Sequence, residues 1–243
     1  MTAVGEATAG VTTDWFEPVP DAELAGIRAF TTTRAAGSFG VASEESVRDV
    51  MGRWDRLRRE LTPSGPRLAT AHQVHGDRVL QHGTGWEGWL RCNDADGHLS
   101  LERGTGMAVS IADCVPVFLW HPSGAIALLH SGWRGTAARI VERAIDVLVS
   151  RGIPPVELSM HLGPAICGKC YEVSADVFQQ VTGRSSDTNT PVDLRAVIAD
   201  HARLRGVRII STSARCTRCD NHRFFSHRAG DAGRQLGVMI AAL

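Results

Sequence analysis

The chain has 243 residues, of which 43% are hydrophobic and 21% are charged, so it can bury a full core in one large domain or two small ones. This composition argues against disordered and fibrous proteins. Because 26 Lys and Arg residues balance 26 Asp and Glu residues, no net charge attracts nucleic acid or anionic lipid, and we expect neither a nucleic-acid nor a membrane partner.

The start of the chain and its cysteines indicate the compartment. The sequence MTAVGEATAG lacks the basic and apolar regions of an export signal, and no apolar run approaches the roughly 20 residues of a membrane span. We therefore expect a cytoplasmic protein. Six cysteines without an export signal favour thiol chemistry or metal binding over a disulfide framework.

The first third of the chain predicts a tail, a strand and a helix. Residues 1–25 are small and polar around Trp15, with two prolines near their end, and we expect them to form an amino-terminal tail. Residues 26–33 (GIRAFTTT) favour a strand. Acidic residues at positions 44 and 45 precede apolar residues at steps of three and four over 47–57, which is typical of an amphipathic helix.

The middle and last thirds predict alternating strands and helices. The runs VPVFLW (115–120) and AIALLHSGW (125–133) are joined by a short turn, which predicts a hairpin, and MAVSI (107–111) precedes them as a strand. Further along we expect helices over 140–148, 174–181 and 193–204, and strands over 157–166 and 207–214. Without a regular βαβ repeat, this order predicts one compact α+β domain over residues 26–243, with mixed sheets flanked by helices.

Three segments carry residues that can hold a metal or perform catalysis. His72 and His75 lie three residues apart in HQVHG, where Gly76 permits a sharp change of direction. Cys114 lies in ADCVPV at the start of one predicted hairpin strand, and His130 lies in HSGWRGT at the end of the other.

If the hairpin turns about Ser123, position 114 faces position 132 and position 130 faces position 116. Cys114 and His130 are then diagonal neighbours on one side of the sheet, about 7 to 8 Å apart at Cα. A register shifted by one residue would place them on opposite faces. A Cys/His/His set suits Zn²⁺ with an open fourth position, but Cys114 with His130 as its base also suits a thiolate nucleophile, and both interpretations stay open.

Charged residues near these segments are candidates for supporting roles. Asp113, beside Cys114, and Asp94 and Asp96 in NDADG can orient an imidazole or handle a proton, although Asp94 also suits a turn. Arg134 and Arg228 are candidates for binding an anion, because a guanidinium matches phosphate oxygens in a bidentate way.

Two CxxC pairs, Cys167 with Cys170 and Cys216 with Cys219, form a possible second metal site. Two such pairs are the ligand set of many structural zinc sites. About 45 residues separate the pairs here, which exceeds the usual spacing of about 15 to 20. The alternative is that these thiols pack as small apolar groups.

In this order, HQVHG, DADG, ADCVPV, HSGWRGT, GPAICGKCYEV and FFSHRAGDAGRQ resemble the laccase-domain family over roughly residue 26 to the end. Its members have been called multicopper polyphenol oxidases and are now regarded as zinc-dependent purine nucleoside phosphorylases. The resemblance implies a compact α+β fold that is also similar to toxin deamidases. It further implies that His75, Cys114 and His130 are the metal ligands.

By the same resemblance the partners are a small nucleoside and phosphate. The implied reaction is phosphorolysis of adenosine, inosine or methylthioadenosine to a free base and ribose 1-phosphate, with adenosine deamination as a side activity. For that reaction we expect Asp113, Cys114, His130, Arg134 and Arg228 to be the catalytic residues, with Asp113 or His72 moving the proton. One bacterial branch is linked instead to hydrolytic editing of peptidoglycan precursors.

The chain departs from the family pattern in three places. The sequence FTTTRAAGSFGVASEE replaces the usual FTTR stretch with its two glycines, His72 is an additional imidazole, and the second CxxC pair exceeds the common motif. A Cys/His/His set would also take Cu²⁺ in vitro by the Irving–Williams order. We rank copper-dependent polyphenol oxidation lower, because none of the 10 histidines forms an HxH pair. A non-enzymatic metal-binding protein is a further alternative.

Overall fold

Two six-stranded mixed sheets form the centre of the structure, a computed structural model that describes residues 14–41 and 45–243. The first sheet has the order β1 (Phe16–Pro18), β2 (Ile27–Thr32), β14 (Gln235–Ala241), β7 (Thr105–Ile111), β3 (Arg67–Ala71) and β5 (Gly88–Cys92). The second has the order β13 (Ile209–Thr212), β10 (Ser159–Leu162), β8 (Val115–Trp120), β9 (Ile126–Ser131), β6 (Gly97–Ser100) and β4 (Val79–His82). Strands β11 (Glu172–Val173) and β12 (Thr190–Pro191) form a separate pair. The helices are α1 (Val47–Leu61), α2 (Trp133–Ala137), α3 (Ile140–Ser150), α4 (Ala175–Thr182) and α5 (Leu194–Leu204).

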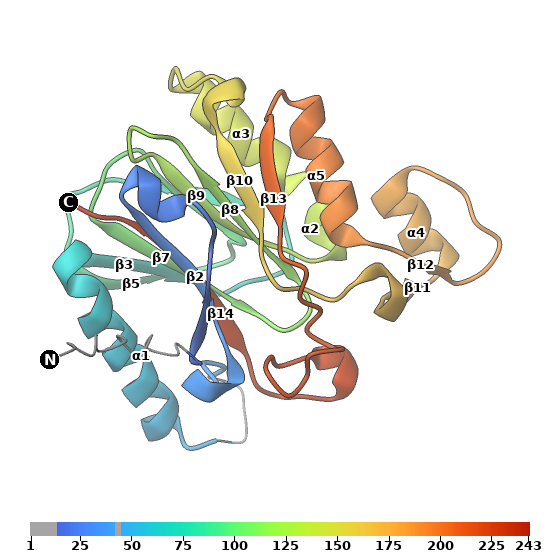
Figure 1. The fold of residues 1–243 in the computed structure, drawn as a ribbon, viewed down its shortest axis with the longest axis horizontal. Coiled ribbons are helices and arrows are strands. Elements are labelled where there is room, and N and C mark those ends of the chain that lie inside the picture. The colour runs from blue at the N-terminus through green and yellow to red at the C-terminus, as the bar shows by residue number, and fades with distance from the viewer. Residues whose placement is uncertain (1–13, 42–44) are drawn as a thin grey trace, which may run out of the picture.

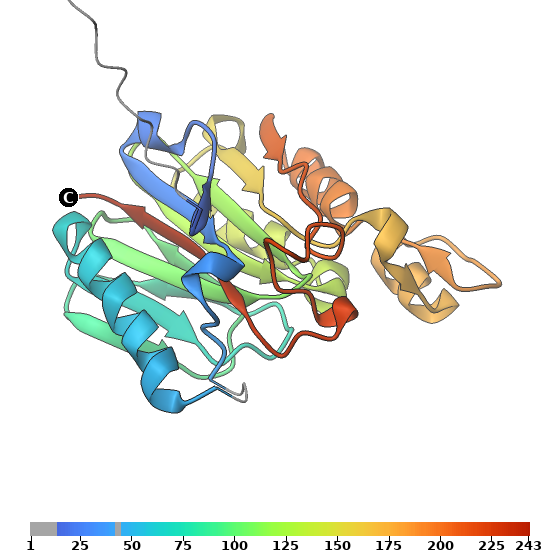
Figure 2. The ribbon, with the colours of Figure 1, turned by 60° about the horizontal axis from the view of Figure 1, so that its bottom comes forward.

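The elements stack in four layers, which Figures 1 and 2 show from two sides. Helix α1 covers the outer face of the first sheet, the two sheets pack against each other, and α3 and α5 cover the outer face of the second sheet. The side chains of β7 illustrate why the first sheet is covered on both faces. Met107 and Val109 face the second sheet, whereas Ala108 between them faces α1. This period of two places apolar side chains on both faces of the central strands. The α+β class with mixed sheets flanked by helices is confirmed.

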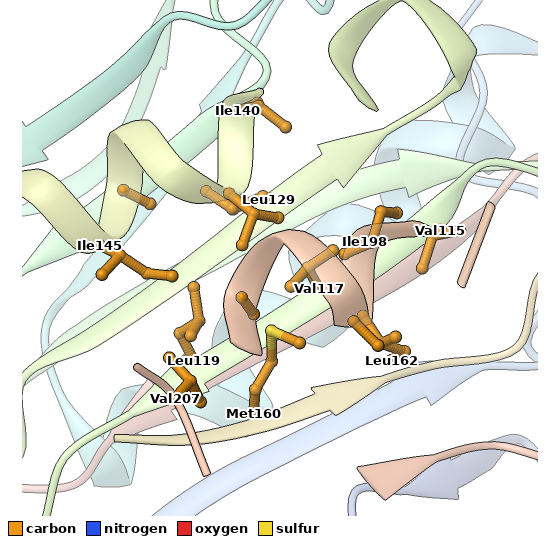
Figure 3. Close-up of a cluster of buried hydrophobic side chains, with 14 of the residues drawn as sticks. Val115, Val117, Leu119, Leu129, Ile140, Ile145, Met160, Leu162, Ile198 and Val207 are labelled. Carbon is orange, nitrogen blue, oxygen red and sulfur yellow. The ribbon is translucent and has the colours of Figure 1, made fainter. Parts of the chain in front are cut away.

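The layer between the second sheet and its helices contains the largest cluster of buried apolar side chains (Figure 3). Leu119 of β8 and Met160 of β10 face Ile145 of α3 and Ile198 of α5, and all four are fully buried. Burying a side chain of this size contributes roughly 1.5 to 3 kcal/mol. This packing holds β8, which begins directly after Cys114, and β9, which carries His130, in a fixed position.

The predicted hairpin has the register that the sequence suggested. Pro116 pairs with His130 and Val115 with Ser131, so the turn is centred on Ser123. The predicted strand over 125–133 is too long, because β9 ends at Ser131 and α2 begins at Trp133 after Gly132. The other predicted strands and helices are present with small shifts of their ends.

The amphipathic helix predicted over 47–57 is α1, which extends to Leu61. Val50, Trp54 and Leu57 are buried against the first sheet, as the spacing indicates, but Val47 is exposed. The acidic residue expected ahead of the helix at position 44 lies outside the described residues. Helix α1 thus closes the first sheet beside the cleft described below, into which Trp54 extends.

The expected amino-terminal tail contributes to the first sheet where it is described. Strand β1 pairs with β2, with Phe16 opposite Thr32, and Phe16 packs on Phe30 at a ring-centroid distance of 5.1 Å. Residues 1–13 of this tail lie outside the described residues, and the division at residue 25 stays a prediction. Within residues 14–41 and 45–243, no helix is long and apolar enough to cross a membrane.

Candidate functional site

The loop after β3 presents His75 through an unusual backbone conformation. The φ angle of His75 is 60°, in the left-handed region that non-glycine residues rarely occupy. Asp96 stabilises this turn, because its carboxylate accepts hydrogen bonds from the backbone N–H groups of Val74 (3.1 Å), His75 (2.9 Å) and Gly76 (2.7 Å). The turn leaves the His75 imidazole exposed toward solvent.

The same carboxylate orients His130, at the end of β9. Asp96 Oδ1 lies 2.8 Å from His130 Nδ1, and both side chains are buried. Strand β6 pairs with β9, and the backbone of His130 donates to Asp96 O at 2.7 Å, so the sheet itself sets this contact. A carboxylate on Nδ1 directs the other ring nitrogen, Nε2, away from it, as is usual for histidines that bind metals.

Cys114 completes a group of three donors with His75 and His130. One donor atom from each residue lies within 4.8 Å of the other two, and the imidazole rings have their centroids 4.8 Å apart in an edge-to-face arrangement. Gly132 leaves room for the thiol, since a Cβ there would lie 2.8 Å from Cys114 Sγ. One thiol, one buried imidazole and one exposed imidazole fit a three-ligand zinc site with an open position. The predicted grouping of these residues is thus present.

The three donors also shift each other's protonation. Burial raises the pKa of the Cys114 thiol, but His130 and His75 outweigh burial and lower it to about 6. Burial lowers the pKa of His130, while Cys114 and Asp96 raise it, to about 9. Burial raises the pKa of Asp96, yet its hydrogen bonds from His130 and the backbone keep that pKa below the usual value. These directions favour a thiolate, the form that binds metals or attacks carbonyl groups.

Asp113 accepts a hydrogen bond on each of its carboxylate oxygens. Its Oδ1 accepts from Thr217 Oγ1 at 2.6 Å, and its Oδ2 accepts from the backbone N–H of Arg228 at 2.7 Å. With a φ of 84°, it is a second residue of the site in the left-handed region. Such conformations persist where surrounding contacts enforce them, often at functional sites. Asp113 therefore ties Cys114 to the segment after β13.

The donors lie in a cleft of about 510 Å³ between the two sheets' ends, α2 and the segment before β14. Its other lining residues include aromatic, basic and polar side chains: Phe39, Trp54, His72, Gln73, Arg91, Trp133, Arg134, Tyr171, His227, Arg228 and Arg234. The guanidinium of Arg134 lies 4.4 Å from the ring centre of Trp133, and that of Arg228 lies 5.0 Å from that of Tyr171. Both predicted anion-binding arginines thus share one cleft with the donors.

The other candidates from the sequence take different places. His72 lines the cleft but pairs with Asp94, whose Oδ1 lies 3.2 Å from His72 Nδ1, and it does not join the group of three donors. Asp94 has a φ of 52°, which agrees with its turn interpretation. Tyr171 and Thr217 also belong to the site, but they were not predicted from the sequence. A signal for Tyr171 existed, since it is the single tyrosine in the sequence and directly follows a CxxC pair.

Tyr171 keeps its proton at neutral pH. Burial, with a further contribution from Cys114, raises the pKa of its phenol to about 12, although Arg228 and Arg134 act in the opposite direction. The phenol can therefore donate a hydrogen bond to a ligand in the cleft.

The two CxxC pairs also meet in space. The four sulfur atoms of Cys167, Cys170, Cys216 and Cys219 lie within 4.8 Å of one another, and all four cysteines are free thiols. This group could hold a metal ion. This group has no residue in common with the Cys/His/His group.

Fold and site together define an α+β protein of two packed sheets with a Cys/His/His donor group in an open cleft. A family model described as multi-copper polyphenol oxidoreductase laccase matches residues 29–242. The chain belongs to this family, as its motifs suggested.

Relatives and solved structures agree with this assignment. A Mycobacterium tuberculosis protein named purine nucleoside phosphorylase is 34% identical over 225 residues, covering 86% of this chain and 89% of its own length. A protein of the same name from Deinococcus radiodurans is 32% identical and covers 89% of each chain. Crystal structures of YlmD from Geobacillus stearothermophilus (27% identity, TM-score 0.83, 90% and 93% covered) and of the hypothetical protein YfiH from Bacillus licheniformis (22%, 0.86, 94% and 97%) share the fold.

Proposed function

We propose that this protein is a zinc-dependent purine nucleoside phosphorylase. It would convert adenosine, inosine or methylthioadenosine and phosphate into the free base and the corresponding ribose 1-phosphate. The observation that carries the proposal is one cleft that combines the Cys114, His75 and His130 donors with the guanidinium groups of Arg134 and Arg228. The names of relatives that are 32% and 34% identical support it.

The donor chemistry fits the metal that the resemblance implies. His75, Cys114 and His130 would hold Zn²⁺, because one thiolate and two imidazoles are ordinary zinc ligands. When bound, the ion would supply a Lewis acid beside the reacting groups. The same donors would also accept Cu²⁺ in vitro, so copper in a preparation would not by itself indicate an oxidase.

Arg134 and Arg228 would bind the attacking phosphate. In phosphorolysis the bond between ribose C1′ and the purine nitrogen breaks, and a bond between C1′ and a phosphate oxygen forms. Within residues 14–41 and 45–243, the Arg134 guanidinium has no hydrogen-bond acceptor, and the Arg228 guanidinium donates one hydrogen bond of 3.2 Å, to Glu172 O. Most of their N–H groups are thus available for phosphate, which a guanidinium binds in a bidentate way.

The departing purine needs a proton, and we assign its delivery to His72. Asp113 is engaged on both oxygens, which favours a positioning role for it. His72 is exposed at the cleft, and its Nδ1 lies 3.2 Å from Asp94 Oδ1, which can hold the ring in one orientation. The aromatic rings of Phe39 and Trp133 line the same cleft and would exclude water from the ribose.

Two further parts of the proposal come from the sequence. Adenosine deamination would be a side activity of the same site. The location would be cytoplasmic, where thiols such as the six free cysteines of the chain stay reduced.

Base release with and without phosphate tests the proposal. Purified protein of measured zinc content is given inosine or adenosine, and the base and ribose 1-phosphate are separated by chromatography. We expect release that requires phosphate, is lost in His75→Ala and persists in His222→Ala, because His222 is exposed and does not line the cleft. No release from folded, zinc-loaded protein would refute it.

A second candidate function is amide hydrolysis by Cys114. Asp96, His130 and Cys114 form the orienting acid, base and nucleophile of a thiol hydrolase, with 2.8 Å between Asp96 and His130. The thiolate would attack the amide carbon, His130 would protonate the departing amine, and water would release the acid from the thioester. Editing of peptidoglycan precursors would be of this kind. Rapid alkylation of Cys114 by iodoacetamide in metal-free protein near neutral pH, together with no phosphorolysis, would favour this function.

A further inference from the structure

The four cysteines of the two CxxC pairs occupy two turns that the second sheet brings together. Cys167 and Cys170 bracket a short turn after β10, and Cys216 and Cys219 follow β13. Strands β10 and β13 are parallel, with Leu162 opposite Thr212, so both CxxC segments leave the same end of the sheet. The long stretch between the pairs is the crossover that contains α4 and α5. The wide spacing in sequence is therefore compatible with one compact site.

The backbone near the thiols is arranged to support sulfur ligands. The N–H groups of Cys167 and Cys219 both point to Cys216 Sγ, at 3.3 and 3.5 Å. Hydrogen bonds of this kind hold a sulfur ligand in a fixed orientation. An isolated bridge joins Ala165 to Cys216, and Thr217 N donates to Ala165 O at 3.2 Å, which fixes the two turns relative to each other.

We propose that Cys167, Cys170, Cys216 and Cys219 bind a second Zn²⁺ ion in a closed, structural site. Four sulfur atoms within 4.8 Å of one another meet the requirement of tetrahedral zinc for four thiolates, and they leave no position for a substrate. Four thiolates around Zn²⁺ carry a net charge of about −2. Lys169 and Arg218, each inside one CxxC pair, supply cations beside that charge.

This ion would brace one wall of the cleft. Thr217 directly follows Cys216 and donates to Asp113, the neighbour of Cys114. Tyr171 directly follows Cys170 and lines the cleft. Binding the ion would thus fix the positions of Thr217 and Tyr171. The four cysteines themselves are not part of the Cys/His/His group to which we assign catalysis. This inference does not depend on the proposed reaction.

Zinc content per chain tests the inference. We expect two equivalents in the native protein purified under reducing conditions, one in Cys219→Ser, and one in His75→Ala. Cys92→Ser is the matched control, because Cys92 belongs to neither group, and it should keep two. The inference is wrong if Cys219→Ser keeps as much zinc as the native protein, or if the native protein holds a single equivalent that His75→Ala removes.

A cobalt spectrum keeps the test independent of the folding of Cys219→Ser. The His75→Ala protein is stripped of metal under reducing conditions and titrated with Co²⁺. Intense sulfur-to-cobalt charge-transfer bands with tetrahedral d–d bands at one equivalent are the expected result. Weak octahedral bands, or an intact mass that shows the thiols joined as disulfides despite the reductant, would overturn the inference.

Discussion

Asp96 is shared between two of the three donor segments, since it lies 2.8 Å from His130 Nδ1 and also accepts the backbone N–H of His75 at 2.9 Å. One carboxylate therefore orients one imidazole and stabilises the strained turn that presents the other. Its loss should weaken both ligands at once.

Asp96→Asn should lower zinc affinity by roughly 10- to 100-fold, the range seen when groups that orient metal ligands are changed. The amide keeps the size of the side chain but removes the charge opposite His130. Competition with a chromogenic chelator measures the affinity. Asp94→Asn is the control, because Asp94 faces exposed His72, and it should bind zinc as the native protein does. Equal affinities in the two variants would contradict the prediction.

Gly132→Ala should displace the Cys114 thiol without unfolding the protein. The φ and ψ of Gly132, −82° and −174°, suit alanine, but the new Cβ would lie 2.8 Å from Cys114 Sγ. We expect loss of most bound zinc at the Cys/His/His group, measured by metal analysis, with an unchanged circular dichroism spectrum. Gly83→Ala, where a Cβ meets open space, should keep its metal. Full metal content in Gly132→Ala would show that the thiol does not need this space.

Arg134→Ala should raise the KM for phosphate by about 10- to 100-fold, because a hydrogen bond to a charged group contributes roughly 1.5 to 3 kcal/mol. Initial rates at varied phosphate concentration measure this effect. Arg203→Ala is the control: Arg203 is 59% exposed on α5 and pairs with Asp200 rather than lining the cleft. A lowered kcat at an unchanged KM for phosphate would show that Arg134 does not bind phosphate.

Two buried histidines should make stability fall in mild acid. Burial, with a smaller contribution from His82, lowers the pKa of His98 to about 3, and burial lowers that of His161 to about 4, against 6.5 for an exposed histidine. Between pH 6.5 and about 4 the unfolded chain binds protons that the folded protein does not. Each group then lowers the free energy of unfolding by up to about 1.4 kcal/mol per pH unit as the pH falls.

Urea unfolding at pH 7, 6 and 5 measures this dependence. His161→Gln should reduce the slope of the unfolding free energy against pH, whereas exposed His222→Gln should leave it unchanged. If His161→Gln does not alter the slope of the unfolding free energy against pH, this histidine binds its proton equally well in the folded and the unfolded protein, which contradicts the prediction.

The hairpin explains which part of the site can be predicted from sequence. Its two apolar runs are nearly symmetric about Ser123, and both faces of β8 and β9 are buried, so a shifted register would misplace every side chain. The relation of Cys114 to His130 follows from that register. The motifs of the family identify the third donor, His75.

Other contacts depend on pairings that local patterns do not reveal. Asp96 reaches His130 because β6 pairs with β9, and it reaches the His75 turn because β6 also pairs with β4. Thr217 reaches Asp113 because β13 pairs with β10. Strand β14 was not predicted, because both of its faces are buried and its sequence QLGVMIA lacks the alternation that marks a half-exposed strand.

The position of β14 limits when the protein can fold during synthesis. This strand comes last among the elements but lies between β2 and β7, both of which pair with it. A nascent chain that has not yet released residues 235–241 from the ribosome has two strand edges open inside its first sheet. Exposed edges of this kind promote aggregation. Shielding of the growing chain would therefore be needed until residues 235–241 have left the ribosome.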